Sequence, residues 1–259
     1  MSRENRELEP TYFDVQAFTG TTKHMGGLRT TKELLELCHV SEDKYVLEVG
    51  CGAGATARYI AKEYGSRVLG VDLHEKMVNL ARARAKREGV ENRTEFRVAD
   101  AQELPFEDDL FDVVIAESVT TFILDKQRAL SEYARVAKPG GCVGVNEEIW
   151  LQTARPAEIV EFVAKTWDIQ SEIPTADGWV RMLENAGLRD VVARPYTFSA
   201  AREATQVLRY GCRDLWGMLS RTISLYLTSS EFRQYMKGRQ RLPKGIWEYL
   251  GYGLFVGRA

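Results

Sequence analysis

The sequence predicts an α/β fold, a doubly wound and mostly parallel sheet of seven strands with a helical insertion before the last strand. Short apolar runs alternate with segments of helical length between residues 45 and 150. This alternation is typical of βαβ units, which place helices on both faces of a sheet. The first apolar run ends in a glycine-rich turn, and the next three end in acidic residues. That arrangement is typical of a sheet that binds a nucleotide at its carboxyl edge.

Seven apolar segments are expected to form the strands. Each has the length of a strand, and most are rich in β-branched or aromatic residues. In chain order they are residues 45–49, 68–71, 94–99, 111–116, 142–145, 191–198 and 252–256.

Helices are expected in the segments between these strands. Residues 75–87 carry apolar side chains at helical spacing, and Gly89 follows as a stop signal. Thr175 is a suitable N-cap for a helix over residues 176–185. Other helices are expected over residues 57–64, 126–137 and 156–169.

The chain divides into four parts. Apolar residues recur at steps of three and four in residues 200–240, which predicts amphipathic helices there. These helices either cover a substrate with an apolar wall or form an accessory pair packed on the sheet. The parts are a leader expected to act as a lid (residues 1–28), a core (residues 29–199), a helical insertion (residues 200–245) and the final strand (residues 246–259).

The composition is that of a globular protein. The 259 residues are 44% hydrophobic and 28% charged, and the formal net charge is −2. Long-range attraction to nucleic acid is therefore not expected, and no apolar run reaches the ~18 residues of a spanning helix. Residues 1–10 are charged and lack the apolar stretch of a signal peptide. We expect a cytoplasmic protein, monomeric or homodimeric, that does not insert stably into a membrane.

The cysteines and histidines show no metal-binding spacing. Because no Cys-x-x-Cys pair occurs, neither a zinc site nor a disulfide framework is predicted. These residues are Cys38, Cys51, Cys142, Cys212, His24, His39 and His74.

The glycine-rich turn places Gly50, Gly52 and Gly54 directly after the first predicted strand. Glycines there permit a tight turn and a close approach of a ligand to the backbone. The pattern also matches the fingerprint of dinucleotide-binding enzymes. An NAD(P)-dependent oxidoreductase is therefore an alternative function, and a tight turn without a ligand is a further interpretation.

Two acidic residues follow the second and third predicted strands. Asp72 can accept hydrogen bonds from the two hydroxyl groups of a ribose, or it can cap the next helix. Asp100, beside a backbone amide, can bind the amino group and ring nitrogen of adenine, or it can be a cap or a solvated acidic residue of a loop. A nicotinamide-dependent oxidoreductase makes no use of Asp100, so this residue distinguishes that enzyme from a protein that binds adenine at the third strand end.

In this order and at this spacing, the motifs resemble those of the class I S-adenosylmethionine-dependent methyltransferases. The similarity covers about residues 28–150 and looks most like the group that contains the ubiquinone and menaquinone C-methyltransferases. Each motif alone is common, but the ordered set is specific. The matching segments are residues 46–54, 70–72, 99–106, 111–114 and 130–141.

The resemblance implies a Rossmann-like methyltransferase fold, S-adenosylmethionine as cofactor, and a small-molecule methyl acceptor that the sequence does not name. It implies that the glycine turn holds the methionine part of the cofactor and that Asp72 holds the ribose. Asp100 and Ala101 would hold the adenine edge, with Leu73 packed on the ring. The implied cofactor contacts are Glu48, Gly50, Cys51, Gly52, Asp72, Leu73, Asp100, Ala101 and Glu117.

The leader is similar to that of the phosphoethanolamine methyltransferases, in which this segment folds over the cofactor. The similarity lies in residues 24–28 and in the helical segment that follows. Those enzymes carry a histidine just after the fourth strand, where this chain has Thr120, Thr121 and Phe122. Their substrate is therefore not carried over to this chain.

Catalysis requires alignment of the acceptor with the activated methyl group, which can supply ~7–11 kcal/mol. A base is needed only when the acceptor carries a proton. Glu147 and its neighbour Glu148 end the fifth strand, so at most one points into the site, and both can also form a solvated loop pair. A non-catalytic adapter that keeps the fold is a third interpretation. The candidate catalytic residues are Glu117, Glu147, Tyr12 and His24.

Overall fold

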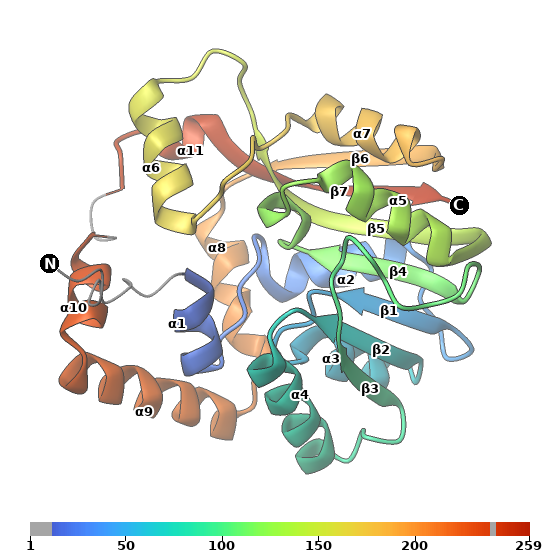
Figure 1. The fold of residues 1–259 in the computed structure, drawn as a ribbon, viewed down its shortest axis with the longest axis horizontal. Coiled ribbons are helices and arrows are strands. Elements are labelled where there is room, and N and C mark those ends of the chain that lie inside the picture. Colours follow the sequence, from blue (N-terminus) through green and yellow to red (C-terminus); the bar gives the residue numbers. More distant parts are fainter. Residues whose placement is uncertain (1–11, 239–241) are drawn as a thin grey trace, which may run out of the picture.

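A computed structural model describes residues 12–238 and 242–259. Its strands are β1 (Tyr45–Val49), β2 (Arg67–Asp72), β3 (Thr94–Val98), β4 (Phe111–Glu117), β5 (Ala137–Trp150), β6 (Arg189–Thr197) and β7 (Leu250–Arg258). They form one seven-stranded sheet in the order β3-β2-β1-β4-β5-β7-β6 (Figure 1). The predicted fold class is therefore confirmed.

The order of the strands reverses at the centre of the sheet. β1 pairs in parallel with both β2 and β4, and β7 runs antiparallel between β5 and β6. In an open parallel sheet, ligands bind beyond the carboxyl ends of the strands at such a reversal. The residues that follow β1, β2 and β4 therefore meet at one edge.

Helices cover both faces of the sheet, and a further group lies beyond its carboxyl edge (Figure 1). In the described part of the chain, no helix combines the length and apolarity that crossing a membrane requires. The helices are α1 (Tyr12–Thr19), α2 (Gly27–Leu37), α3 (Ala55–Glu63), α4 (Glu75–Glu88), η1 (Thr120–Phe122), α5 (Lys126–Val136), α6 (Ala157–Trp167), α7 (Ala176–Asn185), α8 (Ala200–Glu203), η2 (Ala204–Arg209), α9 (Cys212–Thr228), α10 (Ser230–Gly238) and α11 (Ile246–Tyr249).

Two apolar cores join helices to the two faces of the sheet, and a third joins α6 and α11 to the ends of β5 and β7. On one face, Leu34 of α2 packs in a buried cluster with side chains of α3 and α4. On the other face, Tyr133 of α5 and Trp179 of α7 are fully buried. Alternate residues of each strand enter opposite cores, as Val46 and Leu47 of β1 do. The sheet therefore has no solvated face at its centre and holds its carboxyl edge rigidly.

Local signals set several element ends as predicted. Thr175 caps α7 by accepting a hydrogen bond from the amide of Gly178 at 3.2 Å, and Gly89 closes α4 with a φ of 70°. β5 is longer than predicted and continues to Trp150, because its second half pairs with β7. The final part of the chain, residues 246–259, begins with the short helix α11 rather than with the strand.

Candidate active site

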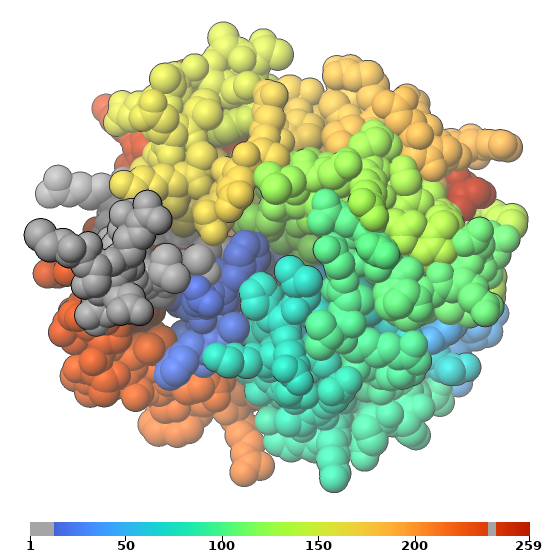
Figure 2. Space-filling model, in the orientation of Figure 1, coloured from blue at the N-terminus to red at the C-terminus, as the bar shows by residue number. Residues whose placement is uncertain are grey.

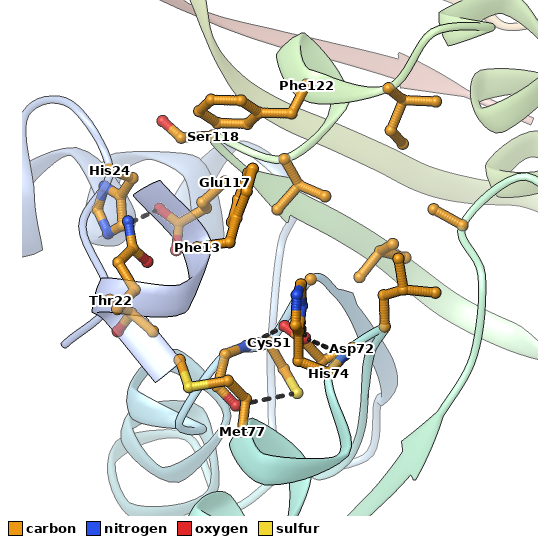
Figure 3. Close-up of a pocket in the computed structure, with 18 of the residues that line it drawn as sticks. Phe13, Thr22, His24, Cys51, Asp72, His74, Met77, Glu117, Ser118 and Phe122 are labelled. Atoms are coloured by element: carbon orange, nitrogen blue, oxygen red, sulfur yellow. Dashed lines mark hydrogen bonds and ion pairs between the residues drawn. The ribbon is translucent and has the colours of Figure 1, made fainter. Parts of the chain in front are cut away.

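A cavity of about 450 Å³ lies beyond the carboxyl ends of β1, β2 and β4. The turns after these strands, helix α1 with the segment that follows it, and Arg209 of η2 all line it. Figure 3 shows side chains that point into the cavity from the turns after the strands and from α1 with the segment that follows it. The predicted residues on its wall are His24, Glu48, Gly50, Cys51, Gly52, Asp72, Leu73, Asp100, Ala101 and Glu117.

The turn after β1 can be formed only by glycine at two positions. Gly50 and Gly52 have φ values of 67° and 51°, in the left-handed region that other residues rarely adopt. A Cβ atom on Gly50 would lie 2.1 Å from Cγ2 of Val119, and one on Gly52 would lie 2.1 Å from Cγ2 of Thr22. Glycine is therefore needed at both positions, where the turn packs closely against Val119 and Thr22 and lines the cavity.

Asp72 supports this turn from the end of β2. One carboxylate oxygen accepts a hydrogen bond from the amide of Gly52 at 2.8 Å, and the other accepts one from the amide of His74 at 2.9 Å. Each oxygen keeps further acceptor capacity. Asp72 thus holds His74, the N-cap residue of α4, although no side chain caps that helix, and Asp72 can still accept hydrogen bonds from a ligand.

The far end of the cavity combines apolar and acidic groups. Leu73 lines the cavity although 65% of the residue is exposed, and Ala101 lies on the same wall. Asp100 is exposed, and its side chain accepts a hydrogen bond from the amide of Gln102 at 2.8 Å. An apolar surface beside an acceptor suits the face and edge of a flat heteroaromatic ring.

Glu48 places a buried carboxyl group next to the glycine turn. The residue is 5% exposed, and its Oε2 has no hydrogen-bond partner among the described residues. Burial, together with the negative charge of Glu117, raises the pKa of Glu48 to about 8. The carboxyl group is therefore protonated at neutral pH, and a cationic ligand group would favour its ionised form.

Glu117 is held in place at the end of β4 by two helices. Thr31 of α2 donates a hydrogen bond to Oε1 at 2.9 Å, and Thr56 of α3 donates one to Oε2 at 2.9 Å. Thr56 also accepts a hydrogen bond from Nη2 of Arg209 at 2.8 Å. Nε2 of His24 lies 3.6 Å from Oε1 of the same carboxylate, as Figure 3 shows. These contacts fix the orientation of the Glu117 side chain.

His24 is a buried, neutral histidine. Its Nδ1 lies 3.2 Å from the carbonyl oxygen of Met25, and its Nε2 lies 3.2 Å from Oγ1 of Thr31. Burial and the positive charge of Arg209 lower the pKa of His24 to about 4, although Glu117 acts in the opposite direction. At neutral pH the ring therefore keeps one nitrogen free of a proton.

Glu147 lies outside the cavity, which differs from our expectation. Its carboxylate accepts hydrogen bonds from the amides of Thr120 and Thr121, each at 2.9 Å, and from the hydroxyl of Thr121 at 2.8 Å. The reason is the alternation of side chains along β5, which turns Glu147 toward η1. Glu147 thus fixes the turn after β4, whereas Glu148 lines a smaller neighbouring cavity.

Tyr12 begins α1, and its side chain lies outside the described residues. Several residues on the cavity wall were not predicted, among them Thr22, Met77 and Arg209. Thr22 stands in a loop, Met77 faces inward from α4 as an ordinary core residue does, and Arg209 stands in the insertion. Because none of them belongs to a motif, the sequence carries no signal that could have identified them.

Phe13 had a partial signal, because an aromatic residue in a polar leader is expected to find an apolar contact. It points from α1 toward the centre of the cavity (Figure 3). Its ring lies 4.9 Å from that of Phe122 in an edge-to-face arrangement and 6.0 Å from that of His74. Helix α1 therefore closes one side of the cavity.

The leader and the insertion contact each other at the rim of the cavity. The hydroxyl of Tyr210 accepts a hydrogen bond from the amide of Thr22 at 2.9 Å and donates one to its carbonyl at 2.6 Å. Glu203 accepts a hydrogen bond from the amide of Gly26 at 2.6 Å. In Figure 2 the blue N-terminal segment lies between the yellow segment with α6 and the orange α9. Both parts therefore limit access to the site.

Comparison with known proteins identifies the core of the chain. Residues 47–145 match a family model described as a methyltransferase domain. An uncharacterized protein of Haemophilus influenzae is 35% identical over 168 residues, which are 64% of this chain and 66% of that protein. A phosphoethanolamine N-methyltransferase of Triticum aestivum is 34% identical over 182 residues, which are 70% of this chain and 34% of that enzyme. The chain thus spans between one third and two thirds of the length of these relatives.

A solved methyltransferase has a similar fold. A phosphoethanolamine N-methyltransferase of Haemonchus contortus, solved with phosphomonomethylethanolamine and S-adenosylhomocysteine, has a TM-score of 0.74 to this structure at 20% identity. The match covers 97% of this chain and 59% of that chain, and it concerns the fold alone. Residues 47–145 thus match a methyltransferase domain, and the glycine turn with acidic residues at the strand ends lies at the carboxyl edge of a fold similar to that of a solved methyltransferase.

Proposed function

We propose that this chain transfers the methyl group of S-adenosylmethionine to a small molecule. The observation that carries the proposal is the joint presence of the glycine turn, Asp72, Asp100 and the buried Glu48 around one cavity. The methyltransferase match over residues 47–145 supports it. The same match favours this function over a nicotinamide-dependent oxidoreductase.

The residues of the cavity fit S-adenosylmethionine. The turn lines the cavity through Gly50 and Gly52, which have no side chains to keep a ligand from their backbone. The unpaired Oε2 of Glu48 suits the amino group of the methionine part, and the spare acceptor capacity of Asp72 suits the ribose hydroxyls. In this proposal the adenine contacts are Leu73, Asp100 and Ala101, and Cys51 and Glu117 complete the wall.

When bound, the sulfonium cofactor supplies a methyl group that is already activated for displacement. The residues of the chain then hold the acceptor in line and keep water away. We assign the positioning of the acceptor to Glu117, whose orientation is fixed. His24 is the candidate base for an acceptor that carries a proton, although its pKa of about 4 makes the ring a weak base. Tyr12 remains a candidate for the same role.

The acceptor is a separate part of the proposal. The motifs that resemble ubiquinone and menaquinone C-methyltransferases belong to the cofactor half of the site, so they do not choose the methylated atom. The named substrate of the phosphoethanolamine enzymes belongs to those proteins. We propose a small acceptor that enters between the leader and the insertion.

Calorimetric titration tests the proposed function. We expect one molecule of S-adenosylhomocysteine to bind per chain and reduced nicotinamide dinucleotides not to bind. An assay with radiolabelled methyl groups and a mixture of metabolites then separates an enzyme from an adapter, because only the enzyme labels an acceptor. Binding of the nicotinamide cofactor instead of S-adenosylhomocysteine would overturn the proposal.

Binding of S-adenosylhomocysteine at pH 7 is expected to release a proton from Glu48. The raised pKa of about 8 keeps this carboxyl group mostly protonated before binding, and the ammonium group of the ligand favours its ionised form. The release should disappear above about pH 9, where Glu48 is already ionised. Calorimetry in buffers of different ionisation enthalpy measures the number of protons released for each molecule of ligand bound.

The Glu48→Gln variant should release no proton at pH 7 and should bind the ligand less tightly. The matched control is Glu63→Gln, which changes an exposed glutamate of α3 and should leave the release unchanged. Proton release that persists in Glu48→Gln would assign it to another group.

A further inference from the structure

A second, smaller cavity of about 50 Å³ adjoins the main one. The two share Lys23, His24, Ser118 and Phe122 on their walls, so a molecule in the smaller cavity lies next to the proposed cofactor site. None of the cofactor contacts proposed above lines the smaller cavity. It is therefore the natural place for part of the methyl acceptor.

Glu148 gives this cavity an unsatisfied negative group. The residue is 8% exposed, and its Oε1 accepts a hydrogen bond from the hydroxyl of Ser118 at 3.0 Å. Its Oε2 has no hydrogen-bond partner among the described residues. A buried carboxylate oxygen without a donor is costly, so a ligand that brings a donor or a positive charge to this oxygen is favoured.

The remaining walls of the smaller cavity are largely aromatic. They include Trp167 at the end of α6, Trp247 of α11 and Phe122 of η1. Trp247 is held by stacking on Phe198 at 4.1 Å, and Phe122 is held edge-to-face by Phe13 at 4.9 Å. Aromatic faces attract a cation, and tryptophan attracts it most strongly.

The charged groups around the cavity support the same choice. Burial raises the pKa of Glu148, and the positive charge of Lys23 lowers it. Lys23 is exposed at the rim, and Asp168 on the wall of the main cavity adds a negative charge nearby. His24 is neutral because its pKa is lowered to about 4. A small cation meets an anion and aromatic faces here, whereas an anion would meet the carboxylate of Glu148.

We propose that the methyl acceptor carries a protonated amino group and that Glu148, with Trp167 and Trp247, forms its binding site. The inference rests on the proposed function, because it takes the larger cavity as the cofactor site. Glu148 then determines specificity. It selects an amine over a neutral molecule of the same shape by pairing with the N–H group through Oε2.

Two small probes of nearly equal shape test the proposal. N,N-Dimethylethanolamine is protonated at neutral pH, and 3-methyl-1-butanol is its neutral isostere. Saturation-transfer NMR gives their dissociation constants for the full chain with saturating S-adenosylhomocysteine. We expect the amine to bind roughly tenfold more tightly or better, because hydrogen bonds between charged groups are the strong ones. Equal affinities of the two probes would overturn the proposal.

Variants assign the preference to its residues. Glu148→Gln should bring the two affinities within about twofold of each other, and the control Glu158→Gln, at an exposed position of α6, should keep the preference. Trp247→Leu should weaken binding of the amine more than that of the alcohol. A preference that persists in Glu148→Gln would overturn the role of Glu148.

The affinity for S-adenosylhomocysteine, measured alone, separates the two proposals. If the parent chain does not bind this ligand, the proposed function fails. If the chain binds it but shows no preference for the amine, only the amine site fails. Glu148→Gln should bind S-adenosylhomocysteine as the parent does, which also shows that the variant is folded.

Discussion

The Gly52→Ala variant is expected to bind S-adenosylhomocysteine at least about 100-fold more weakly than the parent, a loss of roughly 3 kcal/mol. The φ of 51° already disfavours alanine, at a cost of about 1–2 kcal/mol. The added Cβ would lie 2.1 Å from Cγ2 of Thr22, so the turn or the leader must move. The turn and the leader both line the cavity, so either movement disturbs the binding site. Calorimetry measures the loss of affinity.

A matched control separates the effect of the steric clash on ligand affinity from the effect of backbone strain. Gly89 has a φ of 70°, and a Cβ added there would meet nothing within 4 Å. Gly89→Ala should therefore lose stability but bind the ligand as the parent does. Thr22→Ser removes the methyl group that collides, so combining it with Gly52→Ala should restore part of the affinity. If both glycine variants bind normally, the turn does not contact the ligand.

Much of the fold could be predicted because its signals are local. The strands of the core are apolar runs, and residues such as Thr175 and Gly89 end helices through contacts with their immediate neighbours. The length of β5 could not be predicted in the same way. Its second half is a strand because it pairs with β7, more than 100 residues later in the chain, and no local pattern records that pairing.

The strand-end residues were predictable for a geometric reason. In a parallel sheet, the residues after each strand meet at one edge, so Asp72, Asp100 and Glu117 reach the same cavity. The choice between Glu147 and Glu148 was not predictable. Alternation dictates that they face opposite ways, but only the register of β5 against β4 decides which one faces η1.

The part of the site that closes over the cavity had no sequence signal. Arg209 reaches Thr56 across 153 residues, and Tyr210 reaches Thr22 across 188 residues. Such contacts depend on how the leader and the insertion pack on the finished sheet. Sequence patterns predicted that both segments lie near the site and indicated His24, but they did not indicate Thr22 or Arg209, which also line the cavity.

The Asp72→Asn variant is expected to lose about 100-fold in affinity for S-adenosylhomocysteine, or roughly 3 kcal/mol. Hydrogen bonds to a charged group contribute about 1.5–3 kcal/mol each, and the carboxylate would accept them from the ribose. The amide NH₂ of asparagine donates hydrogen bonds and would face the amide of either Gly52 or His74, which Asp72 now satisfies. Calorimetry measures the loss, and Asp177→Asn, an exposed change in α7, should show none.

This loss alone does not separate ribose binding from support of the protein backbone, because Asp72 accepts hydrogen bonds from the amides of Gly52 in the glycine turn and of His74 before α4. An S-adenosylhomocysteine analogue without the 2′-hydroxyl group makes the distinction. If Asp72 accepts a hydrogen bond from that hydroxyl, the parent should bind the analogue more weakly, and Asp72→Asn should bind both ligands nearly alike. If Asp72 only supports the backbone, the variant should lose the same factor for both ligands. The ribose assignment is then wrong, even though the variant binds weakly.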